Sequence, residues 1–178
     1  GDEIGMGDNI FLGDRDGVRT PMQWTAGANG GFSTAAARRL TRPLPDGLYG
    51  PEHVNAADQR HDHQSFWWFI RDLIYTYRQQ PEIGWSTPEI LDQPHAAVLA
   101  HVCRESSGWA MVGLHNFGAE GRLVPLELPD VAPGSVLVDL LDGRGEFPLD
   151  DRGRIEMQLD AYGYRWLRVL RPDEPPII

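Results

Sequence analysis

The pattern of hydrophobic and polar positions changes twice along the chain. Residues 1–50 show neither the 3.6-residue period of an amphipathic helix nor the alternation of a strand, and they are rich in Gly, Asp, Asn and Arg, with prolines as breakers. This pattern predicts a long loop. A loop of such length in a compact protein is uncommon and is usually functional or disordered. Residues 1–50 are therefore the first place to look for a site.

Residues 62–80 give the clearest helical signal. Apolar side chains recur there at spacings of three and four residues and line one helical face. We expect Asp62 or Ser65 to cap the start of this helix, and Pro81 with Gly84 to end it. Two adjacent tryptophans broaden the apolar face, so the helix is expected to dock against a larger body. The face consists of Phe66, Phe69, Ile70, Leu73, Ile74 and Tyr77.

From residue 85 to residue 170 the period changes to two, in short runs separated by turn residues. No helical pattern lies between the runs, which predicts an antiparallel β-sandwich or a Greek-key barrel of six to eight strands. The segments Asp151-Arg152-Gly153 and Ser106-Ser107-Gly108 are predicted to be hairpin turns. The predicted strands are 97–103, 109–116, 122–128, 135–141, 153–159 and 164–170.

Composition narrows the range of partners. The 178 residues carry a formal net charge of -10, which disfavours binding to nucleic acid or to an anionic membrane and leaves a neutral ligand unaffected. Cys103 is the single cysteine, so no internal disulfide can form, and its place in a strand predicts a small buried side chain. No leader and no long apolar run are apparent. The expected compartment is the cytoplasm.

Two motifs in the long loop resemble a known family. Residues 1–6 read GDEIGM and residues 15–24 read RDGVRTPMQW. Both resemble segments that follow the last barrel strand in the trehalose synthase and α-glucosidase branch of glycoside hydrolase family 13, the α-amylase superfamily. Ten consecutive matching residues are a specific signal, and weaker similarity continues in patches to about residue 85.

The resemblance implies a fold. Residues 1–84 would be the C-terminal end of a catalytic (β/α)₈ TIM barrel, with an active-site loop over residues 1–53 and the last helix over about 62–80. Residues 85–178 would be an all-β C-terminal domain, an antiparallel β-sandwich. Loops at the carboxyl ends of barrel strands build the active site in this fold. The long loop is therefore expected at the mouth of the substrate pocket.

The resemblance also implies retaining chemistry on an α-glucoside, in which an Asp nucleophile forms a covalent glucosyl-enzyme and a Glu acts as acid and base. Both carboxylates are expected upstream of Gly1, so no catalytic residue is assigned within the chain, and the chain alone should be inert. No cofactor or metal is expected. The expected partners are a small sugar substrate (maltose, trehalose or a related α-glucoside) and the upstream barrel, and a homo-oligomer is left open.

Within the branch, the spacing of the motifs favours one reaction. Only eight residues separate Met6 from Arg15. The oligo-1,6-glucosidase relatives carry a long insertion in this interval, whereas the trehalose synthases, which isomerise maltose to trehalose, keep it short. An α-glucosidase of the same family remains the alternative. From a different class, residues 85–170 are also compatible with a non-catalytic carbohydrate-binding module.

Three residues of the loop are candidates for substrate binding. The resemblance places Arg15 near the scissile bond, where a guanidinium can donate to sugar hydroxyls. An ion pair with Asp14, with Asp16 or with a carboxylate of the barrel is an equally weighted alternative. For Arg19, hydrogen bonds that hold the loop are favoured over substrate contact. For Trp24, anchoring of the loop is favoured over stacking on a sugar.

Other polar and aromatic residues are set aside. The acidic residues near Arg15 lie on one loop and are expected to make turn contacts rather than a catalytic pair, which must straddle a sugar. His61 and His63 flank Asp62 at the predicted start of the helix, a spacing that does not favour a metal site. Four other tryptophans are read as core or interface residues. These are Trp67, Trp68, Trp109 and Trp166.

Overall fold

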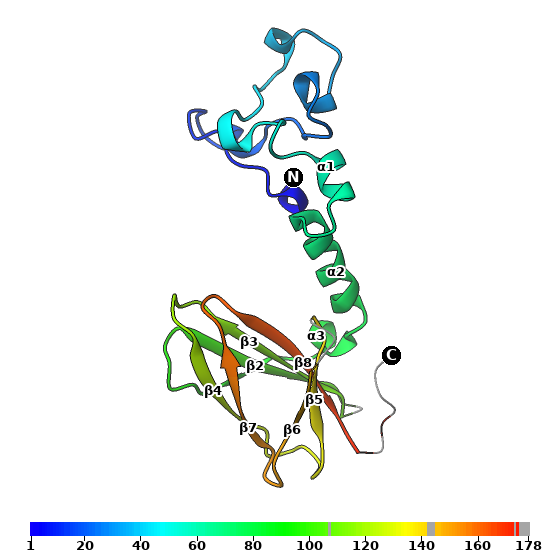
Figure 1. Ribbon diagram of the computed structural model, residues 1–178, viewed down its shortest axis with the longest axis vertical. Coiled ribbons are helices and arrows are strands. Elements are labelled where there is room, and N and C mark those ends of the chain that lie inside the picture. The colour runs from blue at the N-terminus through cyan, green and yellow to red at the C-terminus, as the bar shows by residue number, and fades with distance from the viewer. Residues whose placement is uncertain (107, 142–144, 173, 175–178) are drawn as a thin grey trace. The chain divides into compact units, whose positions relative to one another are not determined.

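The computed structural model describes the chain except for residues 107, 142–144, 173 and 175–178 (Figure 1). The chain forms two compact units, Gly1–Tyr75 and Thr76–Ile178, which we describe separately as unit 1 and unit 2. In the described residues, no helix is long and apolar enough to cross a bilayer. The predicted boundary between the barrel and the C-terminal domain, at residue 84, refers to the domains of a complete enzyme. It stays a prediction.

Unit 1 contains little regular structure. Its first fifty residues form five single-turn 3₁₀ segments and neither an α-helix nor a strand, as expected for the long loop. Two α-helices follow, α1 over Ala56–His61 and α2 over Phe66–Arg78, whose last turn lies in unit 2. The 3₁₀ segments are Asp2–Ile4, Asp16–Val18, Ala28–Gly31, Ala37–Arg39 and Gly47–Tyr49.

The start of α2 differs from the prediction. The amide of Trp67 donates to Oε1 of Gln59 at 3.0 Å, so a glutamine of the preceding helix fills the capping role. The hydroxyl of Ser65 donates to the carbonyl of Gln59 at 2.7 Å, and the carboxylate of Asp62 accepts from the amide of Gln64 at 2.9 Å. Of the two predicted caps, Ser65 occupies the N-cap position, since α2 begins at Phe66 and the carbonyl of Ser65 accepts from the amide of Phe69 at 3.2 Å. The side-chain cap comes from Gln59, because the hydroxyl of Ser65 and the carboxylate of Asp62 are used in the turn before the helix.

The end of α2 also differs. The helix ends at Arg78, and Pro81 is the first residue of a further short helix, α3, over Pro81–Trp85. Proline is well suited to the first helical position, where its missing N–H costs nothing. Gly84 lies inside α3, so it does not form the exit of α2.

Unit 2 consists of two antiparallel sheets. The six-stranded sheet has the order β1-β2-β3-β8-β5-β6, and the two-stranded sheet pairs β4 with β7. All six predicted runs are strands, and the antiparallel arrangement is confirmed; β1 and β6 are additional. The strands are β1 Glu89–Leu91, β2 Val98–Arg104, β3 Ala110–Asn116, β4 Arg122–Glu127, β5 Val136–Asp139, β6 Glu146–Pro148, β7 Arg154–Leu159 and β8 Tyr164–Leu170.

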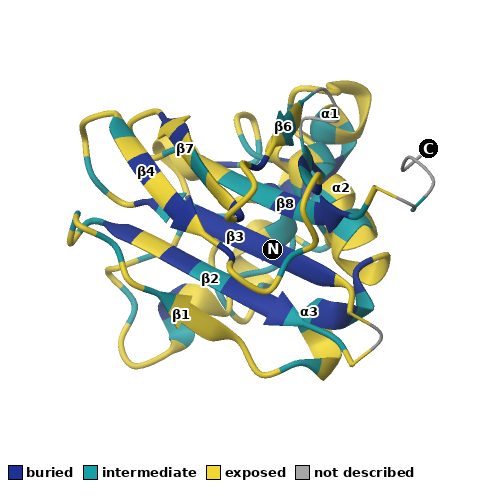
Figure 2. Ribbon diagram, turned by 90° about the horizontal axis from the view of Figure 1, so that it is seen from below, coloured by how far each residue is buried: buried dark blue, intermediate teal, exposed yellow. Residues whose placement is uncertain are grey.

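The core of unit 2 lies between these sheets, as Figure 1 shows for β4 and β7 opposite β2 and β3. Alternate residues of the long strands point inward, and Figure 2 shows their buried positions along β2, β3, β4 and β8. Leu114 and Leu167 come from the six-stranded sheet and Val124 from the other, and all three are fully buried. The two layers make this a sandwich rather than a closed barrel.

The two predicted hairpin turns have different outcomes. β2 and β3 form a hairpin that pairs Arg104 with Ala110, although residue 107 of its turn lies outside the described residues. At the second, the predicted turn is present, since the amide of Gly153 donates to the carbonyl of Asp150 at 2.9 Å, but it does not join a hairpin, because β6 pairs with β5 and β7 pairs with β4. Residues 151–153 therefore carry the chain from one sheet to the other. Gly153 makes this crossing at φ 72°, a conformation that favours glycine.

The outer face of the six-stranded sheet carries two histidines near its centre. His101 lies opposite Gly113 in the β2–β3 register, and its ring occupies the space above that glycine. The rings of His101 and His115 stack with centroids 5.9 Å apart. Burial lowers the pKa of His101. Burial is also the main cause that lowers the pKa of His115, and the positive charge of a protonated His101 lowers it further. The fold therefore favours the neutral form of both rings.

These lowered pKa values predict a pH dependence of stability. The unfolded chain protonates both histidines near their ordinary pKa of about 6.5, before the folded chain does, so the unfolded state binds more protons just below that pH. The free energy of unfolding should therefore fall as the pH falls from 7.5 to 5.5. Urea unfolding at several pH values should show a shallower dependence for the His101→Gln, His115→Gln double variant. The exposed His53, changed to Gln, is the control; an equal effect there would contradict the assignment.

Candidate functional site

Gln23 holds the loop motif in place. The side chain is fully buried, and its Nε2 donates to the carbonyl of Tyr49 at 3.1 Å and to the carbonyl of Val54. The backbone carbonyl of Gln23 accepts a hydrogen bond of 2.9 Å from the backbone amide of Ala56, the first residue of α1. One glutamine thus ties residues 15–24 to the end of the loop and to the first helix.

Other side-chain amides continue this scheme. Nδ2 of Asn29 donates to the carbonyls of Ser33 and Ala35 at 2.8 and 2.7 Å. Nε2 of Gln59 donates to the carbonyl of Ile4 at 2.8 Å. Backbone carbonyls that are buried need hydrogen-bond donors, which in a helix or sheet are backbone amides. In this loop, the side-chain amides take that role. The loop is therefore built by side chains that the sequence analysis did not single out.

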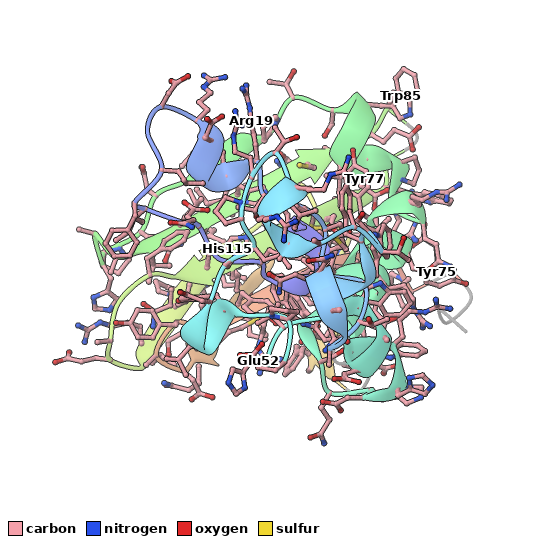
Figure 3. All side chains as sticks on the ribbon, turned by 90° about the horizontal axis from the view of Figure 1, so that it is seen from above. Arg19, Glu52, Tyr75, Tyr77, Trp85 and His115 are labelled. Carbon is pink, nitrogen blue, oxygen red and sulfur yellow. The ribbon has the colours of Figure 1, made fainter. Side chains whose placement is uncertain are left out.

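A pocket of about 410 Å³ opens beside the motif in unit 1. Arg19 lines it, and its side chain extends from the loop toward solvent (Figure 3). Asp16 and Arg42 form an ion pair of 2.7 Å at its wall. Polar groups beside the apolar Met22 and Phe32 are the composition that sugar sites use, since a sugar offers both hydroxyls and C–H surfaces.

Arg15 is exposed, and its guanidinium makes neither a hydrogen bond nor an ion pair with the described residues. The alternative of an ion pair with Asp16 is not what the structure shows, because Asp16 pairs with Arg42. Arg19 likewise makes no side-chain hydrogen bond within the described chain, so it does not hold the loop there. Both arginines are left available for a ligand.

Trp24 lies on a second pocket of about 240 Å³, with Ala56, Ala57 and Trp67 in its lining. Its side chain is 52% exposed, which leaves an indole surface open to a ligand or to another protein segment. Met22 lines both pockets. The structure thus brings Arg19 and Trp24 onto adjoining pockets, whereas Arg15 lines neither.

The residues that were set aside have ordinary structural contacts. His63 stacks on Trp68 with centroids 4.0 Å apart, and Nδ1 of His61 lies 2.7 Å from the carbonyl of Ala57. Among the described residues, no three His, Cys, Asp or Glu side chains are grouped so that they could hold a metal ion. Cys103 is buried, as predicted from its strand.

Comparisons with known proteins cover both units. The trehalose synthase of Pimelobacter sp. (strain R48) is 39% identical over an alignment 178 positions long, which covers 97% of this chain and 30% of that protein. An α-glucosidase of Pediococcus pentosaceus is 35% identical over 82 residues, 46% of this chain and 14% of that protein. This chain thus spans less than a third of the length of either relative.

A solved structure and a family description agree with these relatives. The trehalulose synthase from Pseudomonas mesoacidophila MX-45 superimposes with a TM-score of 0.64 at 27% identity, over 91% of this chain and 27% of that chain. Residues 108–168, within unit 2, match the family described as "Sucrose hydrolase-like, C-terminal domain". The chain therefore belongs to the trehalose synthase and α-glucosidase branch of glycoside hydrolase family 13, and corresponds to a C-terminal part of such an enzyme.

Proposed function

We propose that the chain is the C-terminal part of a trehalose synthase, which isomerises maltose to trehalose by retaining glucosyl transfer. The observation that carries the proposal is the similarity to a trehalose synthase over 97% of the chain, which includes the loop of unit 1 as well as the β-sandwich. Two α-glucosidase relatives match over 46% and 65% of the chain. A trehalose synthase therefore accounts for more of this sequence.

In this proposal, residues 1–84 complete a (β/α)₈ barrel. Residues 1–53 are its last active-site loop, about 62–80 its last helix, and 85–178 the C-terminal domain. The exposed apolar side chains of α2 support the placement, because Phe66, Phe69 and Ile74 need a surface to cover them. The side-chain amides of Gln23, Asn29 and Gln59 hold the loop in one conformation. Such a loop suits a position where groups that bind substrate must be held rigidly.

The chemistry is assigned to carboxylates outside this chain. A carboxylate attacks the anomeric carbon of maltose, the bond to the second glucose breaks, and an acid protonates the departing oxygen. The second glucose stays in the pocket and turns, and its anomeric hydroxyl attacks the glucosyl-enzyme. The acid, now deprotonated, takes the proton of this hydroxyl, the bond between glucose and the nucleophilic carboxylate breaks, and the α-1,1 bond of trehalose forms. Water must stay out during this exchange, since water at the same position yields free glucose.

Arg15, Arg19 and Trp24 are the proposed substrate contacts of this chain. The two guanidinium groups have no partner among the described residues, and a charged donor that meets a sugar hydroxyl forms a stronger hydrogen bond than a neutral donor. The indole of Trp24 presents an apolar surface suited to the C–H face of a pyranose. The 410 Å³ pocket beside Arg19 is large enough for a sugar unit.

Hydrolysis is the second candidate function, because the α-glucosidase relative and the sucrose hydrolase-like domain both point to it. The products formed from maltose distinguish isomerisation from hydrolysis. The full-length enzyme and the 178-residue chain should be incubated with maltose, and trehalose and glucose measured over time. We expect trehalose as the main product of the full-length enzyme and no turnover by the chain. Glucose alone would establish a hydrolase, and turnover by the isolated chain would contradict the placement of the catalytic carboxylates.

A further inference from the structure

Residues 9–17, drawn in blue in Figure 1, form a small loop whose two ends are joined, and we name it the closed loop. The amide of Asn9 donates to the carbonyl of Gly17 at 3.1 Å. Gly17 permits this close approach, because a Cβ at its position would lie 2.7 Å from the carbonyl oxygen of Asn9. Compact surface loops with joined ends are frequently functional.

Hydrogen bonds also fix the two halves of the closed loop. In the first half, Oδ1 of Asn9 accepts from the amide of Phe11 at 3.2 Å. In the second half, the amide of Asp16 donates to the carbonyl of Gly13 at 3.2 Å, and the carboxylate of Asp16 pairs with Arg42 at 2.7 Å. The closed loop therefore presents its side chains from a well-defined backbone.

The closed loop exposes two kinds of side chain. Phe11 is 91% exposed, more than any other large apolar side chain among the described residues, and its neighbour Ile10 is 81% exposed. Arg15 lies on the same loop and is exposed as well. Turn segments are normally polar, whereas adjacent exposed apolar side chains mark a place where something is bound. The packing of unit 1 does not use Phe11, because nearly all of its surface is open.

We propose that Phe11 is a specificity-determining residue, which covers the second glucose in the pocket and keeps water away from the glucosyl-enzyme. The inference rests on the proposed function, in which Arg15 of the same closed loop contacts the substrate. Four residues of chain span at most about 14 Å when fully extended, so a sugar that Arg15 binds lies within reach of the Phe11 side chain. An aromatic ring suits the C–H face of a glucose unit and offers little to hold a water molecule.

Two acceptors compete for the glucosyl-enzyme in this reaction. The anomeric hydroxyl of the second glucose gives trehalose. Water instead gives free glucose: its oxygen bonds to the anomeric carbon, the bond to the nucleophilic carboxylate breaks, and its proton passes to the carboxylate that acts as acid and base. A side chain that covers the pocket lowers the access of water and leaves the second glucose in place. The ratio of glucose to trehalose therefore measures how well the cover works.

This product ratio tests the inference in the full-length enzyme. Phe11→Ala removes the cover, and we expect the ratio of glucose to trehalose formed from maltose to rise at least about threefold. Phe11→Trp keeps a large apolar ring and should stay within about twofold of the parent enzyme. The ratio is set at each glucosyl-enzyme, so it does not depend on how much of a sample is active. Initial rates of formation of both sugars give the ratio.

Leu48→Ala is the matched control, because Leu48 is 81% exposed in the same unit and lies outside the closed loop. It should change the product ratio less than about twofold, as expected for a surface substitution away from the substrate. Thermal unfolding of the three variants should stay close to that of the parent enzyme, since neither side chain packs in a core.

The outcomes separate this inference from the proposed function. If the parent enzyme makes trehalose and Phe11→Ala leaves the product ratio unchanged, the inference is wrong and the proposed function stands. Lower total turnover or a lower melting temperature at an unchanged ratio would assign Phe11 to packing against another part of the enzyme. An equal change of the ratio in Leu48→Ala would show a general disturbance of unit 1. If the parent enzyme forms only glucose, the proposed function fails, and the role of Phe11 fails with it.

Discussion

In the full-length enzyme, Arg15→Ala is expected to lower kcat/KM for maltose about 10- to 100-fold, the equivalent of losing a charged hydrogen bond of about 1.5–3 kcal/mol. The guanidinium of Arg15 is exposed and makes no hydrogen bond or ion pair with the described residues, so the fold does not need it. Thermal unfolding should therefore be nearly unchanged while turnover falls. Steady-state kinetics with maltose measures the effect.

Arg39→Ala is the control for Arg15→Ala, because Arg39 is an exposed arginine of the same loop with no proposed role. It should change kcat/KM less than twofold. If Arg15→Ala behaved like this control, the proposed contact between Arg15 and the substrate would be wrong. A Lys at position 15 should recover only part of the activity, since an ammonium group cannot reproduce the planar fork of a guanidinium.

Gly153→Ala is expected to cost the β-sandwich about 3 kcal/mol of unfolding free energy. Gly153 has φ 72°, and a Cβ at this position would lie 2.2 Å from the carbonyl oxygen of Leu128. This oxygen belongs to the backbone, and Leu128 is held in place by the hydrogen bond from its amide to the carbonyl of Gly153 at 2.9 Å. The strand crossing therefore has no flexible side chain that can move aside.

Gly84→Ala is the matched control for this change, because Gly84 is a helical glycine whose added Cβ would meet nothing closer than the Tyr77 hydroxyl at 3.6 Å. It should be neutral or slightly stabilising. Urea unfolding followed by tryptophan fluorescence compares the two variants. A loss below about 1 kcal/mol for Gly153→Ala would mean that the crossing tolerates a side chain.

The positions of the strands of unit 2 could largely be predicted from the sequence. Which strands pair with one another in each sheet could not. Six runs of alternating residues are strands because one face of each is buried against the core. β1 and β6 were missed because three residues, as in Glu89–Leu91, are too few to show a period. The turn at residues 151–153 has the composition of a hairpin, but local composition cannot reveal that the next strand joins a different sheet.

The candidate site was predicted less completely. The sequence identified the loop and its arginines through a continuous motif, whereas the amides that build the loop act over long separations. Gln23 reaches Tyr49 and Val54, and Gln59 reaches Ile4. Side-chain contacts of this range leave no periodic signal. The one available sign was Gln23 itself, a polar residue between the large apolar side chains of Met22 and Trp24.

The position of β8 has a consequence for synthesis. β8 lies between β3 and β5 and pairs with both, although it is the last described strand along the chain. While the ribosome is still making residues before Tyr164, β3 and β5 expose strand edges that have no partner, and such edges invite aggregation. The nascent sandwich can close only after β8 has emerged, so a chaperone that shields these edges would have to stay bound until residues 164–170 have left the ribosome.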